Sequence, residues 1–401
     1  MTTPAYADAS LARIANPKVE SQAVAATAPD ALFVLNNLGI GGSERKIVRL
    51  VNRLKDEGVH VELACLNGPF TIEQGVRRDI PLRRLEREGK FSFRALWRLR
   101  RILVRERPAT VLAVNLYQAL YVSLATLLLL PYRPRTVALV NTSTFRGHRL
   151  WKRMYQSVLR RFDLIVHGSE AQRQFWFKAN CTAWKNSTVI YNGVDSDQFE
   201  STSVFEAGKR LRASLGVKPE SLLIGTVGMC RPEKNQEMLL TTLRRLRVSR
   251  VDAHLAIAGS GPLLERLRMR AAQLEIADRV HFIGAVEDVR PVLAALDVFC
   301  LPSIAVESFS NAALEAMSMG RPVILSDIGG AREMITDGVE GYVVAPAELD
   351  ARLPAMIAAL YSDRRKRQQM GAAARNRAVS CFSVGAMVAG YRGLLENGAA
   401  Q

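Results

Sequence analysis

Short apolar runs alternate with amphipathic helix patterns along this chain, and the alternation occurs twice. The first series begins with the continuous run Leu32–Leu35, which is typical of a strand buried on both faces. A break follows over residues 186–200, where NSTVIYNGVDSDQFE joins a short strand to Asn-Gly and Asp-rich turn signals. The second series begins at LLIGTVG, residues 222–228. Because strands that alternate with helices form parallel, doubly wound sheets, the sequence predicts two such sheets.

The fold class that we expect is therefore α/β, with two doubly wound, Rossmann-like domains. Sheets of this kind bind ligands beyond the carboxyl ends of their strands, so two facing sheets create a cleft between them. The last helix pattern, residues 384–398, has no strand after it and is expected to cross back onto the first domain. The expected units are a flexible tail, an N-terminal domain, a C-terminal domain and a terminal helix, at residues 1–29, 30–195, 196–380 and 381–401.

Cysteine usage and hydropathy limit where such a chain can work. The 401 residues contain five widely scattered cysteines and no CxxC pair, which favours a reducing compartment and a cytoplasmic protein. Residues 1–29 lack the apolar core of a secretory signal. The most apolar run, residues 116–131, is shorter than the roughly 20 residues of a membrane span. We expect this run to form a buried helix.

Positive charge is concentrated in the first half of the chain. The net charge is +17, and residues 90–161 hold 15 basic residues against one acidic residue, Glu106. Such a surface attracts phosphates of nucleic acids or anionic lipids, although it could also be an ordinary solvated face. Trp151, Tyr155 and Phe162 interleave with the basic residues and suggest peripheral contact with the inner face of an anionic membrane. No nucleic-acid partner is expected, because helix-turn-helix, zinc and aromatic-platform signals are missing from the sequence.

The segment VESFSNAALEAMSMGRPVI, residues 306–324, carries two glutamates eight positions apart. Glu307 and Glu315 cannot be neighbours on one helix face, because helical neighbours are three or four residues apart. Between them, Ser310 or Asn311 can cap a helix whose first turn offers free N–H groups to an anion. The spacing therefore suits an extended ligand with a phosphate in its middle.

Six motifs, in their order and spacing, resemble those of the retaining GT-B glycosyltransferases of family 4 (glycosyl transferases group 1). The segment 306–324 is one, and the resemblance covers about residues 31–395. The other five are GIGGSE, VIYNGVD, VGMCRPEKNQ, AGSGP and VHFIGAVEDV, which begin at residues 39, 189, 227, 258 and 280.

The resemblance implies a nucleotide-sugar donor, UDP- or GDP-linked, and assigns roles around it. Arg231 and Lys234 would clamp the leaving diphosphate, where two fixed cations neutralise developing charge without a metal. Glu307 would hold the sugar and support positive charge at the anomeric carbon, and Glu315 would accept hydrogen bonds from the ribose. The remaining donor-binding residues would be Gly41, Gly42, Val286, Ser308, Phe309, Ser310 and Asn311.

Two positions of the first domain depart from the family pattern. Relatives often carry histidines where this sequence has Asn115 and Asn141, which become candidate acceptor-binding residues. An asparagine cannot act as an acid or base, and this costs little in a front-face mechanism where the departing phosphate takes the acceptor proton. Asp195 and Asp197 imitate a metal-binding DxD, but they lie in the linker, so no metal or other cofactor is expected.

The function that these features indicate is hexose transfer to a glycan or lipid-linked acceptor in polysaccharide- or lipopolysaccharide-type biosynthesis. Two alternatives stay open. One is an epimerase or a phosphorylase on the same fold, and the other is a non-catalytic protein that binds glycans or nucleic acid.

Overall fold

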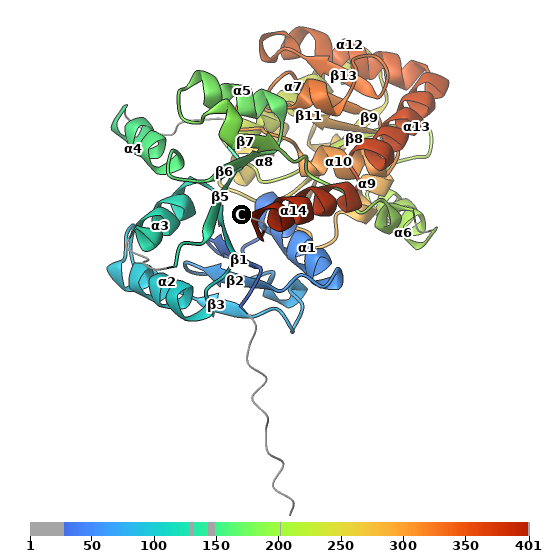
Figure 1. Ribbon diagram of the computed structural model, residues 1–401. Helices are drawn as coiled ribbons and strands as arrows, with labels where there is room; N and C mark the ends of the chain where they lie inside the picture. The colour runs from blue at the N-terminus through green and yellow to red at the C-terminus, as the bar shows by residue number, and fades with distance from the viewer. Residues whose placement is uncertain (1–27, 128–131, 143–148, 201, 400–401) are drawn as a thin grey trace, which may run out of the picture.

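The computed structural model describes residues 28–127, 132–142, 149–200 and 202–399, and within them the chain forms two parallel β-sheets (Figure 1). Helices cover both faces of each sheet. The predicted α/β fold with two Rossmann-like domains is confirmed. We call each sheet with its helices the first and the second domain. Most of the tail expected at residues 1–29 lies outside the described residues.

The first sheet has seven strands in the order β3-β2-β1-β4-β5-β6-β7. Its strands are β1 (Ala31–Leu35), β2 (Val61–Cys65), β3 (Leu82–Arg84), β4 (Thr110–Val114), β5 (Arg135–Val140), β6 (Leu164–His167) and β7 (Ser187–Val189). Its helices are α1 (Gly42–Asp56), α2 (Phe93–Glu106), α3 (Leu116–Thr126), α4 (Arg149–Leu159) and α5 (Glu170–Lys178), with short 3₁₀ turns η1 (Glu73–Gly75) and η2 (Trp184–Asn186).

The second sheet repeats this winding with six strands, in the order β10-β9-β8-β11-β12-β13. Its strands are β8 (Leu222–Val227), β9 (Ala253–Ala258), β10 (Val280–Gly284), β11 (Val298–Leu301), β12 (Val323–Ser326) and β13 (Gly341–Val344). Its helices are α6 (Thr202–Ser214), α7 (Gln236–Val248), α8 (Leu264–Gln273), α9 (Arg290–Ala295), α10 (Asn311–Ser318), α11 (Ala331–Met334), α12 (Leu349–Ser362) and α13 (Arg364–Cys381). Four 3₁₀ turns complete it, namely η3 (Ser196–Phe199), η4 (Pro232–Lys234), η5 (Ala277–Arg279) and η6 (Pro346–Glu348).

The apolar run of β1 shows why these strands are hydrophobic on both faces. All five of its residues are buried. Leu32 and Val34 face one hydrophobic cluster, which includes α2 and α3, and Phe33 and Leu35 face another, which includes α1. Alternate side chains thus enter opposite layers of the first domain, as expected for a central parallel strand.

The last helix, α14 (Val384–Ala399), lies beside α1 and packs on the first domain (Figure 1). Met387, Tyr391 and Leu395 join the cluster that contains Phe33. The chain therefore crosses between the domains twice. The two crossings touch at Gly193, where a Cβ atom would stand 2.6 Å from the carbonyl oxygen of Ser383, so only glycine fits.

The apolar run at residues 116–131 forms α3 as far as Thr126, and α3 packs into the core of the first domain as predicted. Residues 128–131 lie outside the described part of the chain. None of the described helices combines the length and the apolarity that crossing a bilayer requires. All five cysteines are described and free, and Cys381 is the exposed one among them.

One expectation about the basic first domain is wrong. Phe162 was expected at the surface with Trp151 and Tyr155, but it is only 3% exposed. It follows α4 directly and joins the hydrophobic cluster beneath that helix. Trp151 remains about half exposed and stacks on Tyr155 with ring centroids 6.2 Å apart.

Candidate functional site

The candidate residues of the second domain gather where β8 and β11 lie side by side. From β8 the sheet grows outward through β9 and β10 on one side, and through β11, β12 and β13 on the other. Ligands of doubly wound sheets usually bind at the point where the order of strands reverses in this way. Arg231 and Lys234 follow β8, and the loop with Glu307 follows β11. The two loops are joined by a 2.9 Å hydrogen bond from the Ile304 amide to the Glu233 carbonyl oxygen.

Lys234 and Glu307 form a direct ion pair. Lys234 Nζ lies 2.6 Å from Glu307 Oε2, and the Ser303 hydroxyl donates to the same oxygen at 3.0 Å. Both side chains are partly buried. The pair places a fixed cation and a fixed carboxylate within one small site, which is an arrangement that can stabilise opposite charges on a reacting ligand.

Backbone strain marks the loop that carries Glu307. Val306 has φ +65°, a left-handed conformation that is a genuine outlier for a β-branched residue. Gly329 packs so closely on this loop that a Cβ atom there would lie 2.2 Å from the Glu307 carbonyl oxygen. Strain of about 1–3 kcal/mol persists only where the surroundings impose it, and it is concentrated at functional sites.

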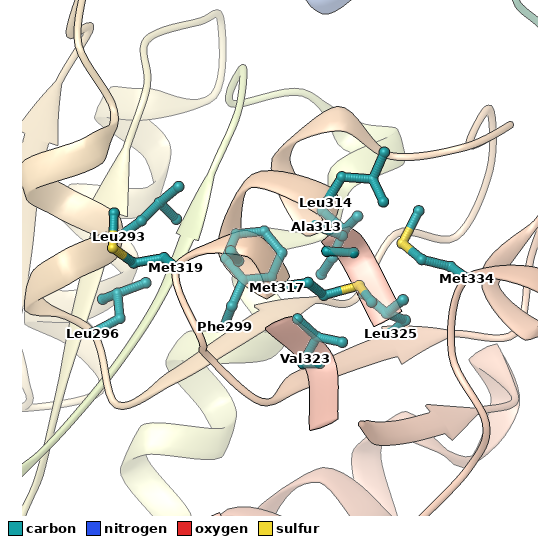
Figure 2. Packing of buried hydrophobic residues seen from close by; sticks show 14 of the residues in the cluster. Leu293, Leu296, Phe299, Ala313, Leu314, Met317, Met319, Val323, Leu325 and Met334 are labelled. Atoms are coloured by element: carbon teal, nitrogen blue, oxygen red, sulfur yellow. The ribbon is translucent and has the colours of Figure 1, made fainter. Parts of the chain in front are cut away.

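Helix α10 begins directly after this loop, and Ser310 is its N-cap. The Ser310 hydroxyl accepts a 3.2 Å hydrogen bond from the Ala313 amide, so Ser310 and not Asn311 caps the helix. Met317 lies beside Phe299 of β11 and Val323 and Leu325 of β12, and it anchors the helix on these strands (Figure 2). The first amides of a helix have no partner within the helix, so this rigid start can receive an anion.

The first residue of α10 and the loop before it also contact the first domain. The Asn311 Nδ2 donates to the Gly42 carbonyl oxygen at 2.9 Å, and the Ser308 hydroxyl lies 3.5 Å from the carbonyl oxygen of Asn141. The ring of Phe309 turns inward and packs against Tyr191, with centroids 5.0 Å apart. Phe309 can therefore offer only its main chain to a ligand.

Arg231 reaches toward the first domain. Its side chain is 47% exposed, and it lies 4.0 Å from Glu233. It is also close enough to Glu44, in the first turn of α1, to lower the pKa of that carboxyl, although burial has the larger effect and raises it. Glu44 folds over Gly41, where its carboxylate occupies the space of a Cβ atom. Gly41 and Gly42 thus start α1 opposite Arg231.

Glu315 lies deeper on α10 and faces arginines of α1. Arg49 Nη2 is 3.7 Å from Glu315 Oε1, and burial raises the pKa of this carboxyl while Arg49 and Arg45 lower it. Arg45 donates a 3.3 Å hydrogen bond to the Val286 carbonyl oxygen. Helix α1 therefore touches both Glu315 and the loop with Val286, on the same side of the site.

The two asparagines follow neighbouring strands of the first sheet, β4 and β5. Asn115 has φ +77° and ψ 167°, a conformation that glycine usually takes. Asn141 accepts a 3.0 Å hydrogen bond from Lys46 Nζ. Lys46 was missed by sequence reasoning, and the only signal was its place four residues before Leu50, at the edge of the apolar stripe of α1.

Asp195, of the DxD-like pattern, and His167, at the end of β6, have surroundings that suit a structural role. Asp195 forms a 2.7 Å ion pair with Arg53 of α1. The first aspartate of the DxD-like pattern therefore holds the linker against the first domain. His167 is fully buried, and burial lowers its pKa to about 4. In the described parts of the chain, no three His, Cys, Asp or Glu side chains converge in a way that could hold a metal ion.

Each half of the chain matches a family model. Residues 40–198 match the model described as glycosyltransferase family 4, and residues 208–377 match glycosyl transferases group 1. Together the two models cover every candidate residue above.

Known proteins similar to this chain include two bacterial mannosyltransferases. A GDP-mannose-dependent alpha-(1-6)-phosphatidylinositol monomannoside mannosyltransferase of Mycobacterium tuberculosis is 36% identical over 55% of this chain and 59% of its own length. The lipopolysaccharide core biosynthesis mannosyltransferase LpsB of Rhizobium meliloti is 30% identical over 55% of this chain and 61% of its own. The chain thus spans less than two thirds of these curated relatives.

Solved structures share the fold across nearly the whole chain. Anabaena Alr3699/HepE, solved in complex with UDP-glucose, superposes with a TM-score of 0.80 over 92% of this chain and 99% of its own. Its sequence identity is 21%, so this similarity concerns the fold alone.

Proposed function

This chain belongs to the GT-B glycosyltransferases of family 4, and on that premise we propose that it transfers a hexose from a nucleotide-diphosphate sugar to a glycan or lipid-linked acceptor. The observation that carries the proposal is the 2.6 Å pair of Lys234 and Glu307 beside the start of α10. A cation, a carboxylate and free helix amides are the groups that a departing diphosphate and an electron-poor sugar need.

The donor would lie across the two domains. Its diphosphate would meet Arg231, Lys234 and the first amides of α10, with Gly41 and Gly42 on the opposite side. Glu315 would accept hydrogen bonds from the ribose. The loop with Val286 would contact the base. Glu307 would hold the sugar, where its negative charge favours positive charge developing at the anomeric carbon.

Transfer would proceed with retention and without a metal. Arg231 and Lys234 supply fixed positive charge for the leaving group. Asn115 and Asn141 can orient an acceptor or a sugar hydroxyl, but an amide cannot take the acceptor proton at neutral pH. The departing phosphate oxygen is then the base, on the same face of the sugar that the acceptor attacks.

The donor is proposed to be a GDP- or UDP-sugar. GDP-mannose is the first to test, because two relatives that are at least 30% identical are mannosyltransferases by name and one of them is GDP-mannose-dependent by name. The same names favour a lipid-linked or lipopolysaccharide acceptor. The basic first domain would then work at the inner, anionic face of a cytoplasmic membrane.

The test is a panel of nucleotide sugars read by thermal shift, followed by a transfer and hydrolysis assay with the donor that binds. Stabilisation by one nucleotide sugar and release of its nucleoside diphosphate support the proposal. An epimerised nucleotide sugar, or phosphorolysis to a sugar 1-phosphate, would instead support the epimerase or phosphorylase alternative. Failure of every nucleotide to bind would favour a non-catalytic protein.

A further inference from the structure

Lys46 is a buried lysine whose environment does not match its charge. It stands in the second turn of α1 and is 6% exposed. Among the described residues its ammonium donates only to Asn141 Oδ1, at 3.0 Å, and no carboxylate forms an ion pair with it. A buried lysine without an acidic partner is unusual, because burying an unpaired charge is costly.

Asn141 adds further unused hydrogen-bond donors at the same place. Its Nδ2 atom is buried and has no hydrogen-bond partner within the described chain. An ammonium has three N–H donors and an amide has two, so a single bond from Lys46 to Asn141 leaves four N–H groups without an acceptor. A ligand that is rich in oxygen and negatively charged would satisfy them.

Lys46 and Asn141 lie at the edge of the candidate site. Asn141 follows β5, at the carboxyl edge of the first sheet, and its carbonyl oxygen lies 3.5 Å from the Ser308 hydroxyl. Helical side chains incline toward the N-terminus of their helix, so Lys46 extends toward the Gly41–Gly42 turn. Glu44, two residues earlier, points to another side of α1, because residues two apart do not share a face.

We propose that Lys46 and Asn141 form a phosphate-binding subsite on the first-domain side of the cleft. The inference rests on the proposed function, because that function places a sugar donor beside the subsite. The phosphate is either part of the donor diphosphate or a group on the acceptor, and both sources present the same oxygens. The phosphate would neutralise the Lys46 ammonium. Without it, the positive charge of Lys46 near the sugar would oppose the positive charge that develops at the anomeric carbon.

The experiment compares the parent chain with Lys46→Met and Lys46→Gln by isothermal titration calorimetry at pH 7. The titrants are GDP, UDP and inorganic phosphate. Methionine keeps the length of the side chain without its charge, and glutamine can still donate to Asn141. We expect both variants to bind phosphate-bearing titrants roughly tenfold or more weakly, because a charged hydrogen bond is lost.

Each outcome has a separate meaning. Weaker binding of nucleotides and inorganic phosphate alike supports a subsite for the donor diphosphate, and weaker binding of inorganic phosphate alone supports one for an acceptor phosphate. Unchanged affinity of both variants for all three titrants overturns the subsite, as does a parent that binds none of them at millimolar concentration. A parent that binds phosphate through Lys46 but no nucleotide contradicts the proposed function and keeps the subsite. Thermal unfolding of each variant excludes misfolding.

Discussion

The side-chain amide of Asn192 donates a 2.8 Å hydrogen bond to the carbonyl oxygen of Phe309. Asn192 lies in the linker between the two sheets, and Phe309 lies in the loop before α10. Both residues are buried. This contact explains why an Asn-Gly turn lies in the linker. The asparagine fixes the loop of the second domain, and the glycine at position 193 lets the second crossing of the chain pass close by.

We predict that Asn192→Asp disturbs the site more than Asn192→Ala. A carboxylate cannot donate, and it would place negative charge against the Phe309 carbonyl oxygen. Breaking this buried bond should lower the free energy of unfolding by about 1–3 kcal/mol and weaken nucleotide binding. Urea unfolding and nucleotide titration measure the two effects.

The matched control is Asn52→Asp, because the Asn52 Nδ2 also donates to a main-chain carbonyl, that of Gly75, but at an exposed position. Equal effects of the two aspartate variants would mean that the contact of Asn192 does not position the loop.

Lys234→Met should reduce kcat by roughly 10²–10³-fold, the loss that follows removal of one group aimed at developing charge. The control is Lys209→Met, which removes the cation of an exposed 2.8 Å pair with Glu206 on α6. The measurement is the steady-state rate with whichever nucleotide sugar the thermal-shift panel selects as the donor. A Lys234→Met enzyme as active as the Lys209→Met enzyme would remove Lys234 from the mechanism.

The grouping of the second-domain candidate residues could be predicted from sequence because its signals are local. A buried strand, a short polar loop and a helix start follow one another over residues 298–318, so position along the chain fixes position in space. The first sheet and its glycine turn were predictable for the same reason. The elements β3, β13, α12 and α13 were not predicted, because their patterns are short or only weakly amphipathic.

Contacts between distant segments could not be predicted. Glu333 of α11 accepts hydrogen bonds from the amides of Glu170 and Ala171 at 2.7 and 2.8 Å, and so caps α5 of the other domain. The pair of Lys46 and Asn141 joins residues 95 positions apart. Such pairs depend on how the two domains meet, which no periodicity encodes. Phe162 was misassigned because a basic run with aromatics has the same composition whether its rings face water or a core.

Glu315→Gln should weaken binding of a ribonucleotide but not of its 2′,3′-dideoxy analogue, if this carboxylate receives the ribose hydroxyls. The raised pKa adds a pH dependence with a definite sign. The acceptor form is the carboxylate, so ribonucleotide affinity of the parent should fall as the pH is lowered through that raised pKa. Calorimetric titration over a range of acidic pH checks this. Equal losses for both nucleotides would assign Glu315 a structural role only.

Helix α2 offers a direct test of membrane contact. Phe93 and Trp97 are 79% and 60% exposed on a helix with many arginines, a combination that suits an anionic lipid surface. We expect Phe93→Ser with Trp97→Ser to reduce flotation with phosphatidylserine-containing vesicles. Met269→Ser on α8, an apolar residue of the second domain that is as exposed as Trp97, should not reduce it. Flotation that is the same for all three proteins would exclude α2 as the contact.

Lys46→Met should make the protein more stable at pH 7. Burial lowers the pKa of Lys46 from 10.5 to about 8. Between these values the unfolded chain binds the proton more tightly than the folded one, so the stability of the parent rises with pH across this window. The lowered pKa corresponds to roughly 3 kcal/mol of unfolding free energy. The parent protein lacks this stabilisation at pH 7 and gains it by about pH 10.5.

Chemical unfolding of the parent and of Lys46→Met from pH 7 to 10.5 checks this prediction. The difference between their unfolding free energies at each pH isolates the effect of Lys46, because all other groups titrate in both proteins. The gap in unfolding free energy should shrink as the pH rises, and the exposed Lys209→Met variant should show no such trend. A gap that stays constant would mean that Lys46 is not a buried cation. A variant that is more stable yet binds phosphate more weakly would show that the charge is kept for binding, because folding alone would select against it.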